Sequence, residues 1–290
     1  MANLIDIRRR IRSVKSTQQI TKAMKMVAAS KLRRSQERVL AARPYARTLE
    51  ATLAAVLTRV APREDGTPLH PLLETRPAKR ALVVAVSGDK GLCGALNTNV
   101  NRATGQLVRD LTARKLAVSL VVLGRKGVDF WKRRSVPIVD SRPGIFQRFD
   151  YQTAAEIARA LGTRFTSGDF DEVWVVYNEF RSVLSQVVEQ RRLLPLELPA
   201  AASDAGDAIY EPSADAILSR LLPRNLEFQL FRVLLEANAA FYASQMTAME
   251  GASKNAAELI DSLTLTYNRA RQAKITKELI EIVSGAEALE

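Results

Sequence analysis

A glycine-rich loop is the segment whose residue types come closest to a chemical motif. It reads Ser-Gly-Asp-Lys-Gly-Leu-Cys-Gly from Ser87 to Gly94, between an apolar run and a stretch of helical pattern. In doubly wound folds, loops at this place hold nucleotide phosphates. The spacing is G-x-x-G-x-x-G, however, which is neither the dinucleotide motif nor the P-loop, because Ala95 and Leu96 follow Gly94. A tight turn with close strand–helix packing is favoured, and a nucleotide-dependent enzyme is the alternative.

Other reactive side chains are isolated from one another. His70 is the single histidine and lies in a connector, so we expect a solvated loop residue with no second histidine for a metal. Cys93 is the single cysteine, which excludes an internal disulfide and favours a packed thiol over a nucleophile. The carboxylates are scattered and form no evident catalytic pair. The sequence therefore predicts no autonomous catalysis, no cofactor and no metal site.

Two long stretches that lack helix breakers flank the segment with these residues. Residues 1–60 contain no glycine and one proline, Pro44; residues 224–284 contain no proline and one glycine, Gly251. As helices, each would be roughly 80–90 Å long at ~1.5 Å per residue. Such helices are stable only when their apolar stripes are covered. We expect the two to wind around each other as an antiparallel coiled coil.

The first stretch fits a heptad ruler. Eleven of its fifteen core positions are apolar, which supports a coiled-coil seam. Three of the four polar exceptions cluster at 18–25, and this favours a segment that faces other proteins. The fifteen positions are Ile7, Ile11, Val14, Gln18, Thr21, Lys25, Ala28, Leu32, Ser35, Val39, Ala42, Ala46, Leu49, Leu53 and Val56.

The last stretch follows a slightly longer period, nearer 11/3 than 7/2. Its expected seam is Leu230, Leu234, Ala237, Phe241, Gln245, Ala248, Ala252, Ala256, Leu259, Leu263, Tyr267 and Ala270. Beyond it the tail becomes strongly apolar. Four residues share one face and two more widen it: Ile275, Leu279, Ile282 and Ala286, then Ile280 and Val283. One partner helix cannot cover that breadth, so the tail predicts an apolar socket; a frayed terminus is the alternative.

Between the two stretches, apolar strand patterns alternate with helical ones. The strand patterns are 81–86, 116–123, 136–139, 172–177 and, as an edge strand, 182–189; the helical ones are near 95–114, 125–133 and 151–166. This alternation predicts a three-layer, Rossmann-like α/β domain with a mainly parallel sheet. The expected organisation is a helix at 1–60, a connector at 61–77, the α/β domain at 78–198, a linker at 199–212 and a helix at 213–290.

Charge is unevenly distributed along the 290 residues. The net charge is +12, and residues 1–50 alone hold 13 Lys/Arg against 3 Asp/Glu. The partner of that helix is expected to be acidic: nucleic acid, anionic lipid or acidic protein. A basic coiled-coil nucleic-acid-binding protein is therefore an alternative function. The sequence contains no run of 18 apolar residues, so no transmembrane helix is predicted. The N-terminus lacks the apolar core of a signal peptide.

Three segments carry a resemblance to a known family. Residues 11–33, Ile-Arg-Ser-Val-Lys-Ser-Thr-Gln-Gln-Ile-Thr-Lys-Ala-Met-Lys-Met-Val-Ala-Ala-Ser-Lys-Leu-Arg, resemble the N-terminal helix of the gamma subunit of F-type ATP synthases. Residues 275–288, Ile-Thr-Lys-Glu-Leu-Ile-Glu-Ile-Val-Ser-Gly-Ala-Glu-Ala, resemble the C-terminal signature of that family. The loop at 88–97 is similar as well, and the resemblance spans the whole chain.

The resemblance implies a rotating central shaft. Its terminal helices would form the coiled coil, and its apolar tip would turn inside a sleeve made by an α3β3 ring. The α/β domain would sit with epsilon on a ring of c subunits, with one copy of the chain per complex. Catalysis would occur on β, and proton flow would drive ADP phosphorylation. The implied location is the cytoplasmic face of a bacterial inner membrane, as a peripheral protein, since no transit peptide is visible.

The resemblance also implies roles for particular residues. Arg271 and Gln272 correspond to a contact with a loop of β, and Thr276 and Glu281 to one surface of the signature. Met24 and Lys25 fall in the segment that faces the levers of β. The apolar tip in the α3β3 sleeve would comprise Ile275, Leu279, Ile282 and Val283. Thiol switching of the kind that chloroplast forms use is not expected with a single cysteine.

Overall fold

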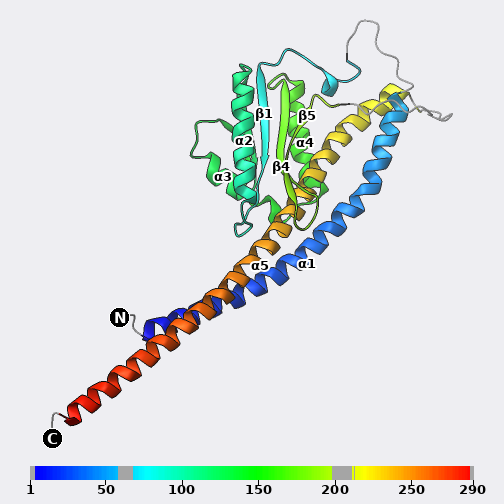
Figure 1. Cartoon of the computed structure of the whole chain (residues 1–290). Helices are drawn as coiled ribbons and strands as arrows, with labels where there is room; N and C mark the ends of the chain where they lie inside the picture. The colour runs from blue at the N-terminus through cyan, green and yellow to red at the C-terminus, as the bar shows by residue number, and fades with distance from the viewer. Residues whose placement is uncertain (1–3, 58–67, 198–210, 212, 288–290) are drawn as a thin grey trace. The chain divides into compact units, whose positions relative to one another are not determined.

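The computed structural model describes residues 4–57, 68–197, 211 and 213–287. By internal contacts the chain divides into a larger unit, residues 30–244, and a smaller unit, residues 1–29 with 245–290. Two long helices, α1 (Leu4–Leu57) and α5 (Ala214–Glu287), run through both units (Figure 1). Most of the expected linker at 199–212, and residues 61–67 of the expected connector, lie outside the described residues.

The larger unit contains one five-stranded sheet in the order β3-β2-β1-β4-β5. The strands are β1 (Arg80–Val86), β2 (Ala117–Leu123), β3 (Ile138–Arg142), β4 (Glu172–Phe180) and β5 (Gln186–Leu194). The helices between them are α2 (Leu96–Ala113), α3 (Arg125–Trp131) and α4 (Tyr151–Thr166), with short turns at Pro71–Leu73 and Ile145–Gln147. The first four strands are parallel, and β5 is antiparallel to β4. The predicted mainly parallel α/β fold is confirmed.

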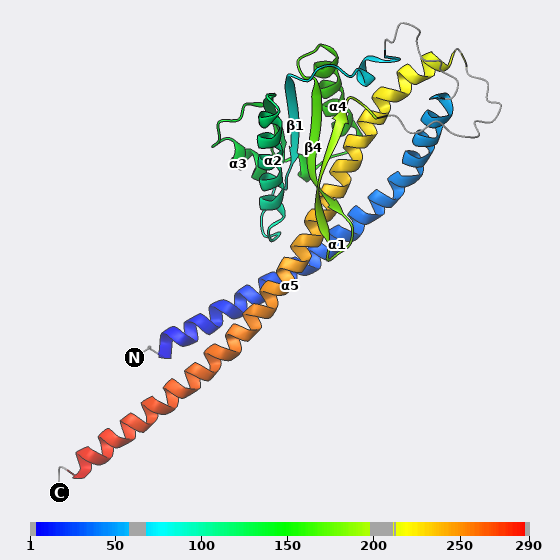
Figure 2. The ribbon, with the colours of Figure 1, turned by 45° about the horizontal axis from the view of Figure 1, so that its top comes forward.

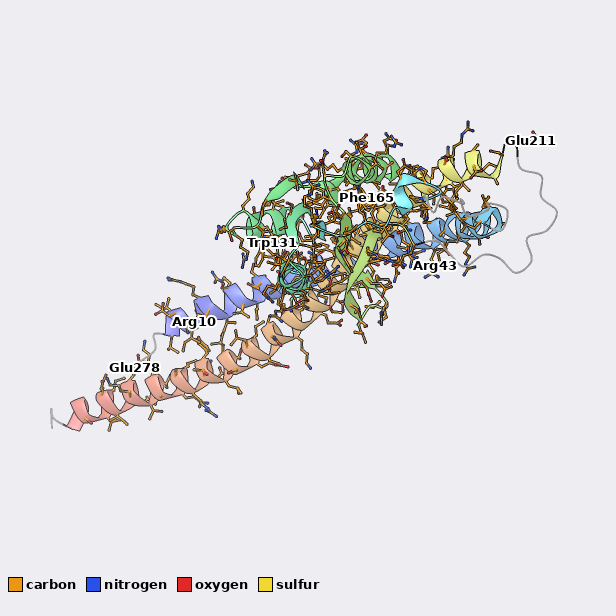
Figure 3. The ribbon with its side chains drawn as sticks, turned by 90° about the horizontal axis from the view of Figure 1, so that it is seen from above. Arg10, Arg43, Trp131, Phe165, Glu211 and Glu278 are labelled. Carbon is orange, nitrogen blue, oxygen red and sulfur yellow. The ribbon has the colours of Figure 1, made fainter. Side chains whose placement is uncertain are left out.

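Both faces of the sheet are covered because its central strands are apolar on both sides. In β1, six of seven residues are buried. One face packs on α2 and α3 through residues such as Val83, Leu107 and Trp131. The other face packs on α4 and α5 through residues such as Val84, Phe165 and Leu230. Figure 3 labels Trp131 and Phe165, which lie in these two opposite layers.

Two strand predictions were displaced along the chain. The third strand begins at Ile138 rather than Val136, and the edge strand covers 186–194 rather than 182–189. The edge strand starts late because residues 182–185 form the turn after β4. In that turn the Ser185 N–H donates to the Ser182 carbonyl and Ser182 hydroxyl, at 3.3 and 3.1 Å. Serine hydroxyls that bind nearby backbone compete with strand pairing in this way.

The start of β1 is fixed by a carboxylate from the start of β4. The Asp171 carboxylate accepts the N–H groups of Lys79 and Arg80 at 2.8 and 2.9 Å and pairs with the Arg76 guanidinium at 3.4 Å. Burial alone would raise the pKa of Asp171, but these partners outweigh it. The pKa therefore lies below its ordinary value of 3.8.

We expect this carboxylate to make the fold acid-sensitive. Because the folded-state pKa of Asp171 is lowered, its stabilisation is complete above the unfolded value, about 3.9, and is lost as pH falls through the lower folded value. Urea denaturation at pH 5 and pH 3 should show a smaller loss of stability for Asp171→Asn than for the parent chain. Asp169→Asn, which changes an exposed neighbour, should leave the loss unchanged. Equal losses in all three proteins would contradict the assignment.

Within the larger unit, α1 and α5 pack as an antiparallel pair. The seam positions of α1 from Leu32 to Val56 are all buried or half-buried. Polar Ser35 is tolerated because its hydroxyl accepts from the Asn238 amide at 2.9 Å. The Tyr45 and Phe228 rings lie 4.9 Å apart further along. From one contact to the next, the residue number rises along α1 and falls along α5, so the two helices are antiparallel.

The smaller unit is also an antiparallel helix pair. Arg8 donates to the Tyr267 hydroxyl at 2.6 Å, and Lys25 pairs with Glu250 at 2.6 Å. Figure 2 shows α5 extending past the N-terminal end of α1. One predicted seam position is wrong: Leu259 is 48% exposed, while its neighbour Ile260 is half-buried. The seam position at this turn is Ile260 instead of Leu259, while Ala256 and Leu263 on either side stay in the seam.

Candidate functional site

The C-terminal end of α5 exposes an unusual amount of apolar side chain. Every residue from Arg271 to Ser284 is exposed. The exposed fractions are 48% for Ile275, 58% for Leu279, 60% for Ile280, 68% for Ile282 and 57% for Val283. Since α1 begins at Leu4, close to the level of Tyr267, the last sixteen residues of α5, about 24 Å of helix, lie beyond it. A contiguous apolar patch of this kind marks an interaction site.

The exposed end is amphipathic around its axis. At roughly 100° per residue, the apolar side chains occupy one half of the helix surface. Four of the five charged residues, Lys274, Lys277, Glu278 and Glu281, occupy the other half (Glu278 is labelled in Figure 3). They form i,i+4 pairs at 3.5 Å for Lys274–Glu278 and 3.4 Å for Lys277–Glu281. Such pairs support the helix without covering its apolar half.

The structure groups most of the predicted contact residues on the apolar half. Arg271, Gln272 and Thr276 are exposed and lie on the same half as the aliphatic side chains. The Thr276 hydroxyl donates to the Gln272 carbonyl at 3.0 Å, the usual bond of an exposed helical threonine. Glu281 lies among the charged residues instead. Five residues from Thr276 amount to about 140° around the helix, so these two do not share a face as expected.

The predicted contact residues on α1 are half-buried beside α5. Met24 is half-buried, and Lys25 is half-buried with its amine paired to Glu250. The polar cluster at 18–25, which is predicted to face other proteins, also lies against α5: Gln18 is half-buried and Thr21 is buried at 8% exposure. Those positions belong to the seam of the smaller unit, opposite small residues of α5 such as Ala257. Small partners leave room for polar side chains there.

Apolar residues of α1 that sequence reasoning did not single out are exposed instead. Ile20, Met26 and Val27 are 56%, 63% and 56% exposed. Ile20 and Val27 are seven residues apart and therefore share a face. Their signal was visible in the sequence, because large aliphatic residues outside a heptad seam have no place in a two-helix rod.

The glycine loop is occupied by the chain itself. A Cβ added to Gly88 would lie 2.8 Å from Cδ2 of Phe241, so the ring of α5 rests on the glycine backbone. The Gly88 N–H donates to the Asn97 side-chain oxygen at 2.8 Å, which takes the donor that a phosphate would need. The Asp89 carboxylate accepts three backbone N–H groups, from Arg125, Gly144 and Phe146, at 2.7–2.8 Å. The predicted tight turn with close packing is confirmed.

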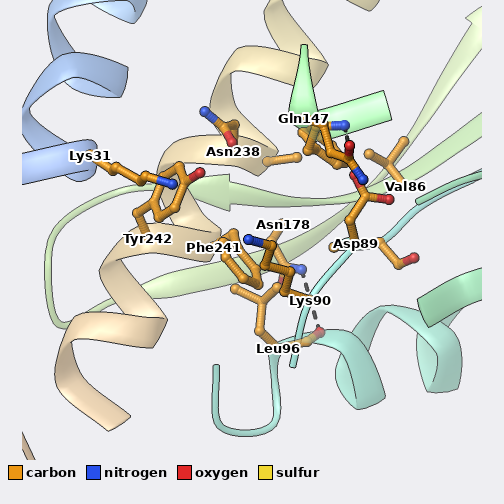
Figure 4. A pocket seen from close by; sticks show the side chains of 14 residues that line it. Lys31, Val86, Asp89, Lys90, Leu96, Gln147, Asn178, Asn238, Phe241 and Tyr242 are labelled. Carbon is orange, nitrogen blue, oxygen red and sulfur yellow. Dashed lines mark hydrogen bonds between the residues drawn. The ribbon is translucent and has the colours of Figure 1, made fainter. Parts of the chain in front are cut away.

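A cavity of about 390 Å³ remains beside this loop (Figure 4). Asn178 and Asn238 lie in its wall, and their amides already donate to the Leu96 carbonyl and the Ser35 hydroxyl. Lys31 lies over the Tyr242 ring at 5.4 Å. The polar groups of the wall mostly serve the fold.

The isolated reactive residues also have structural roles. His70 accepts the Leu72 N–H at its Nδ1, 3.1 Å away, and caps a short turn; partial burial lowers the pKa of His70. It is a cap rather than the solvated side chain that was expected. Cys93 is buried, and burial raises the pKa of its thiol, as a packed thiol requires. Among the described residues, no His/Cys/Asp/Glu group could hold a metal, and no helix has the length and apolar content to cross a membrane.

Known proteins match the chain over its full length. A family model described as ATP synthase matches residues 3–289. The ATP synthase gamma chain of Chlorobium phaeobacteroides is 49% identical, with 100% of this chain and 99% of the relative covered. The gamma chain of an Anaeromyxobacter species is 48% identical, with both chains covered completely.

Solved structures match as well. A chain in the central stalk and c-ring of Tetrahymena thermophila mitochondrial ATP synthase is 27% identical with a TM-score of 0.61, covering 81% of this chain and 99% of that one. A chain of the Euglena gracilis mitochondrial ATP synthase, 20% identical with a TM-score of 0.69 over 99% and 94% of the two chains, shares the fold. This coiled coil with an inserted α/β domain therefore belongs to the gamma-chain family of the F-type ATP synthases.

Proposed function

We propose that this chain is the central rotor shaft that couples proton translocation through the membrane sector to ATP synthesis and hydrolysis on an α3β3 ring. The shaft role follows from membership of the gamma-chain family, whose relatives cover the whole chain. The matched relatives give no support to the nucleic-acid-binding alternative. In this proposal the chain is a non-catalytic subunit, and the β subunits hold the catalytic sites.

The observation that carries the proposal is the uncovered apolar half of α5 beyond Ala270. Ile275, Leu279, Ile282 and Val283 would turn inside an apolar sleeve formed by α3β3. A sleeve fits this surface better than a fixed partner because most of the patch is aliphatic. Aliphatic contacts have no directional bonds to break when the helix rotates.

The same proposal extends to the surroundings of the shaft. One copy per complex would contact the α and β subunits, epsilon and the c-subunit ring. The chain would be a peripheral protein at the cytoplasmic face of a bacterial inner membrane, bound through the complex. The proposal also keeps the predicted domain organisation, in which a connector and a linker join the α/β domain at 78–198 to the two terminal helices.

Reconstitution tests the proposed role directly. We would mix the full chain with α and β subunits, isolate the complex by size and assay ATP hydrolysis. A complex with one copy of this chain and with hydrolysis well above that of the ring alone supports the shaft role. A well-folded chain that stays outside the ring would overturn it.

Arg271 and Gln272, which begin the exposed end of α5, provide a sharper test. We expect the double variant Arg271→Ala, Gln272→Ala to reduce ATP synthesis and coupled hydrolysis by roughly tenfold. Each substitution removes hydrogen bonds to a loop of β. Such a bond contributes about 0.5–1.5 kcal/mol net, and more when the donor is charged, as in Arg271. Lys274→Ala with Lys277→Ala is the matched control on the charged half, where both residues are exposed. Unchanged turnover in the first pair, or equal losses in both, would remove these residues from the contact.

A further inference from the structure

The glycine loop at 87–97 has no role in the proposed sleeve contact, although many hydrogen bonds hold it to the α/β domain. Within the larger unit it packs on α5 through an apolar cluster that includes Cys93 and Leu96, and two contacts there are specific. The Phe241 ring rests on Gly88, where an added Cβ would be 2.8 and 3.1 Å from two ring carbons. The Ser244 hydroxyl donates to the Cys93 carbonyl at 2.7 Å. Phe241 and Ser244 lie three residues apart, on one side of the helix.

The loop is rigidly attached to the sheet. Both ends of the Asn97 amide are used, the oxygen by the Gly88 N–H at 2.8 Å and the nitrogen by the Lys90 carbonyl at 3.1 Å. The Ser87 hydroxyl accepts the Gly127 N–H at 2.7 Å. Asp89 ties the loop to the starts of α3 and of the turn at Ile145–Gln147 through three N–H groups. A force on the loop is therefore carried by the whole domain.

A second attachment lies further toward the N-terminal end of α5. The Glu227 carboxylate accepts from the Tyr151 hydroxyl at 2.8 Å and pairs with Arg159 at 2.7 Å, so α4 is bound to α5 there. Glu227 and Phe241 are fourteen residues apart, about 21 Å along the helix. Together with the apolar packing of α5 on the sheet, two polar attachments with this separation prevent the domain from pivoting about either one.

We propose that the contact of loop 87–97 with Phe241 and Ser244 is the joint through which the α/β domain turns α5. This inference rests on the proposed shaft function, since it concerns how torque enters the helix that ends in the apolar tip. The two points resist different motions. The ring on Gly88 blocks rotation of α5 toward the loop, and the Ser244 bond resists sliding along the helix axis.

Two glycines of the same loop supply a matched pair of variants. In Gly88→Ala the new methyl group must displace the Phe241 ring, whereas in Gly91→Ala the new Cβ meets only the end of Lys126, at 3.8 Å. Both would be measured in the complete membrane-bound complex, as protons pumped per ATP hydrolysed. For Gly88→Ala we expect this ratio to fall about threefold or more with hydrolysis retained, because packed contacts tolerate little displacement. Gly91→Ala should match the parent complex, and equal ratios in both variants would overturn the proposal.

A second variant keeps the proposal testable if Gly88→Ala does not assemble. Ser244→Ala removes the hydroxyl that donates to the Cys93 carbonyl at 2.7 Å and adds no volume. We expect protons pumped per ATP to fall about twofold or more with hydrolysis retained, because one hydrogen bond of the joint is lost. Ser262→Ala removes a hydroxyl from an exposed position of the same helix and should match the parent complex. A Ser244→Ala complex that pumps as the parent complex does would refute the joint.

The failure of this inference can be distinguished from failure of the shaft function. If the chain were not the shaft, the parent complex would lack pumping that depends on it. If the shaft function holds and the joint does not, the parent complex pumps normally and Gly88→Ala pumps equally well.

Discussion

Replacing Leu279 and Ile282 by aspartate should abolish most coupled ATP synthesis while leaving the fold intact. Both side chains are more than half exposed, so the variant costs the isolated chain only a few tenths of a kcal/mol. Inside an apolar sleeve, each carboxylate would lose its water without gaining a partner, at a cost of several kcal/mol. Because about 1.4 kcal/mol corresponds to a tenfold change, we expect a loss of at least about tenfold in ATP synthesis by the assembled complex.

Two other exposed leucines of α5 provide the control. Leu259 and Leu265 are 48% and 62% exposed and precede the apolar tip. Leu259→Asp with Leu265→Asp adds the same charge to the same helix and should retain assembly and most of the synthesis rate. If both pairs of variants lost activity equally, the effect would come from charge on the helix in general, and the tip would have no special role.

Removing the Asp89 carboxylate should produce a large loss of stability in the α/β domain. In Asp89→Ala, the N–H groups of Arg125, Gly144 and Phe146 lose their common acceptor. Bonds to a charged acceptor are worth about 1.5–3 kcal/mol each, but water replaces part of this at a half-buried site, so we expect a loss of about 3 kcal/mol. For a unit of this size that lowers Tm by roughly 6–12 °C.

Fluorescence of buried Trp131 during urea or thermal unfolding would measure the effect within the domain. Asp89→Asn should cost less than Asp89→Ala, because an amide oxygen at Oδ1 still accepts from Arg125 and Gly144. Asp129→Ala removes an equal charge from an exposed position of α3 and should change stability by less than about 0.5 kcal/mol. An Asp89→Ala variant as stable as Asp129→Ala would show that water satisfies all three N–H groups.

Long-range periodicity predicted the architecture well because burial follows it directly. All fifteen heptad positions of α1 are buried or half-buried, including Gln18, Thr21 and Lys25. That the polar cluster faces other proteins stays a prediction, but its place in the seam was not foreseen, for a physical reason. Polar side chains are compatible with a seam when the opposing helix offers small residues, and a single helix examined alone does not show its partner.

The covering of the glycine loop could not be predicted from local pattern. The loop and Phe241 are about 150 residues apart in sequence, and nothing in the spacing G-x-x-G-x-x-G indicates what rests on its first glycine. Leu259 shows a similar limit, since a one-residue rotation of the α5 seam depends on the local packing of both helices. The roles of Arg271, Gln272 and Glu281 depend on other subunits and remain predictions.

The cap at His70 and the buried thiol of Cys93 have a consequence for the response of this chain to pH. Burial lowers the pKa of the single histidine and raises that of the single cysteine. Both shifts favour the uncharged form of the side chain near neutral pH. A small change of pH around neutrality should therefore change the charge of these two side chains less than it would change the charge of a solvated imidazole or thiol. The short turn that His70 caps should keep its Nδ1 acceptor through such a change.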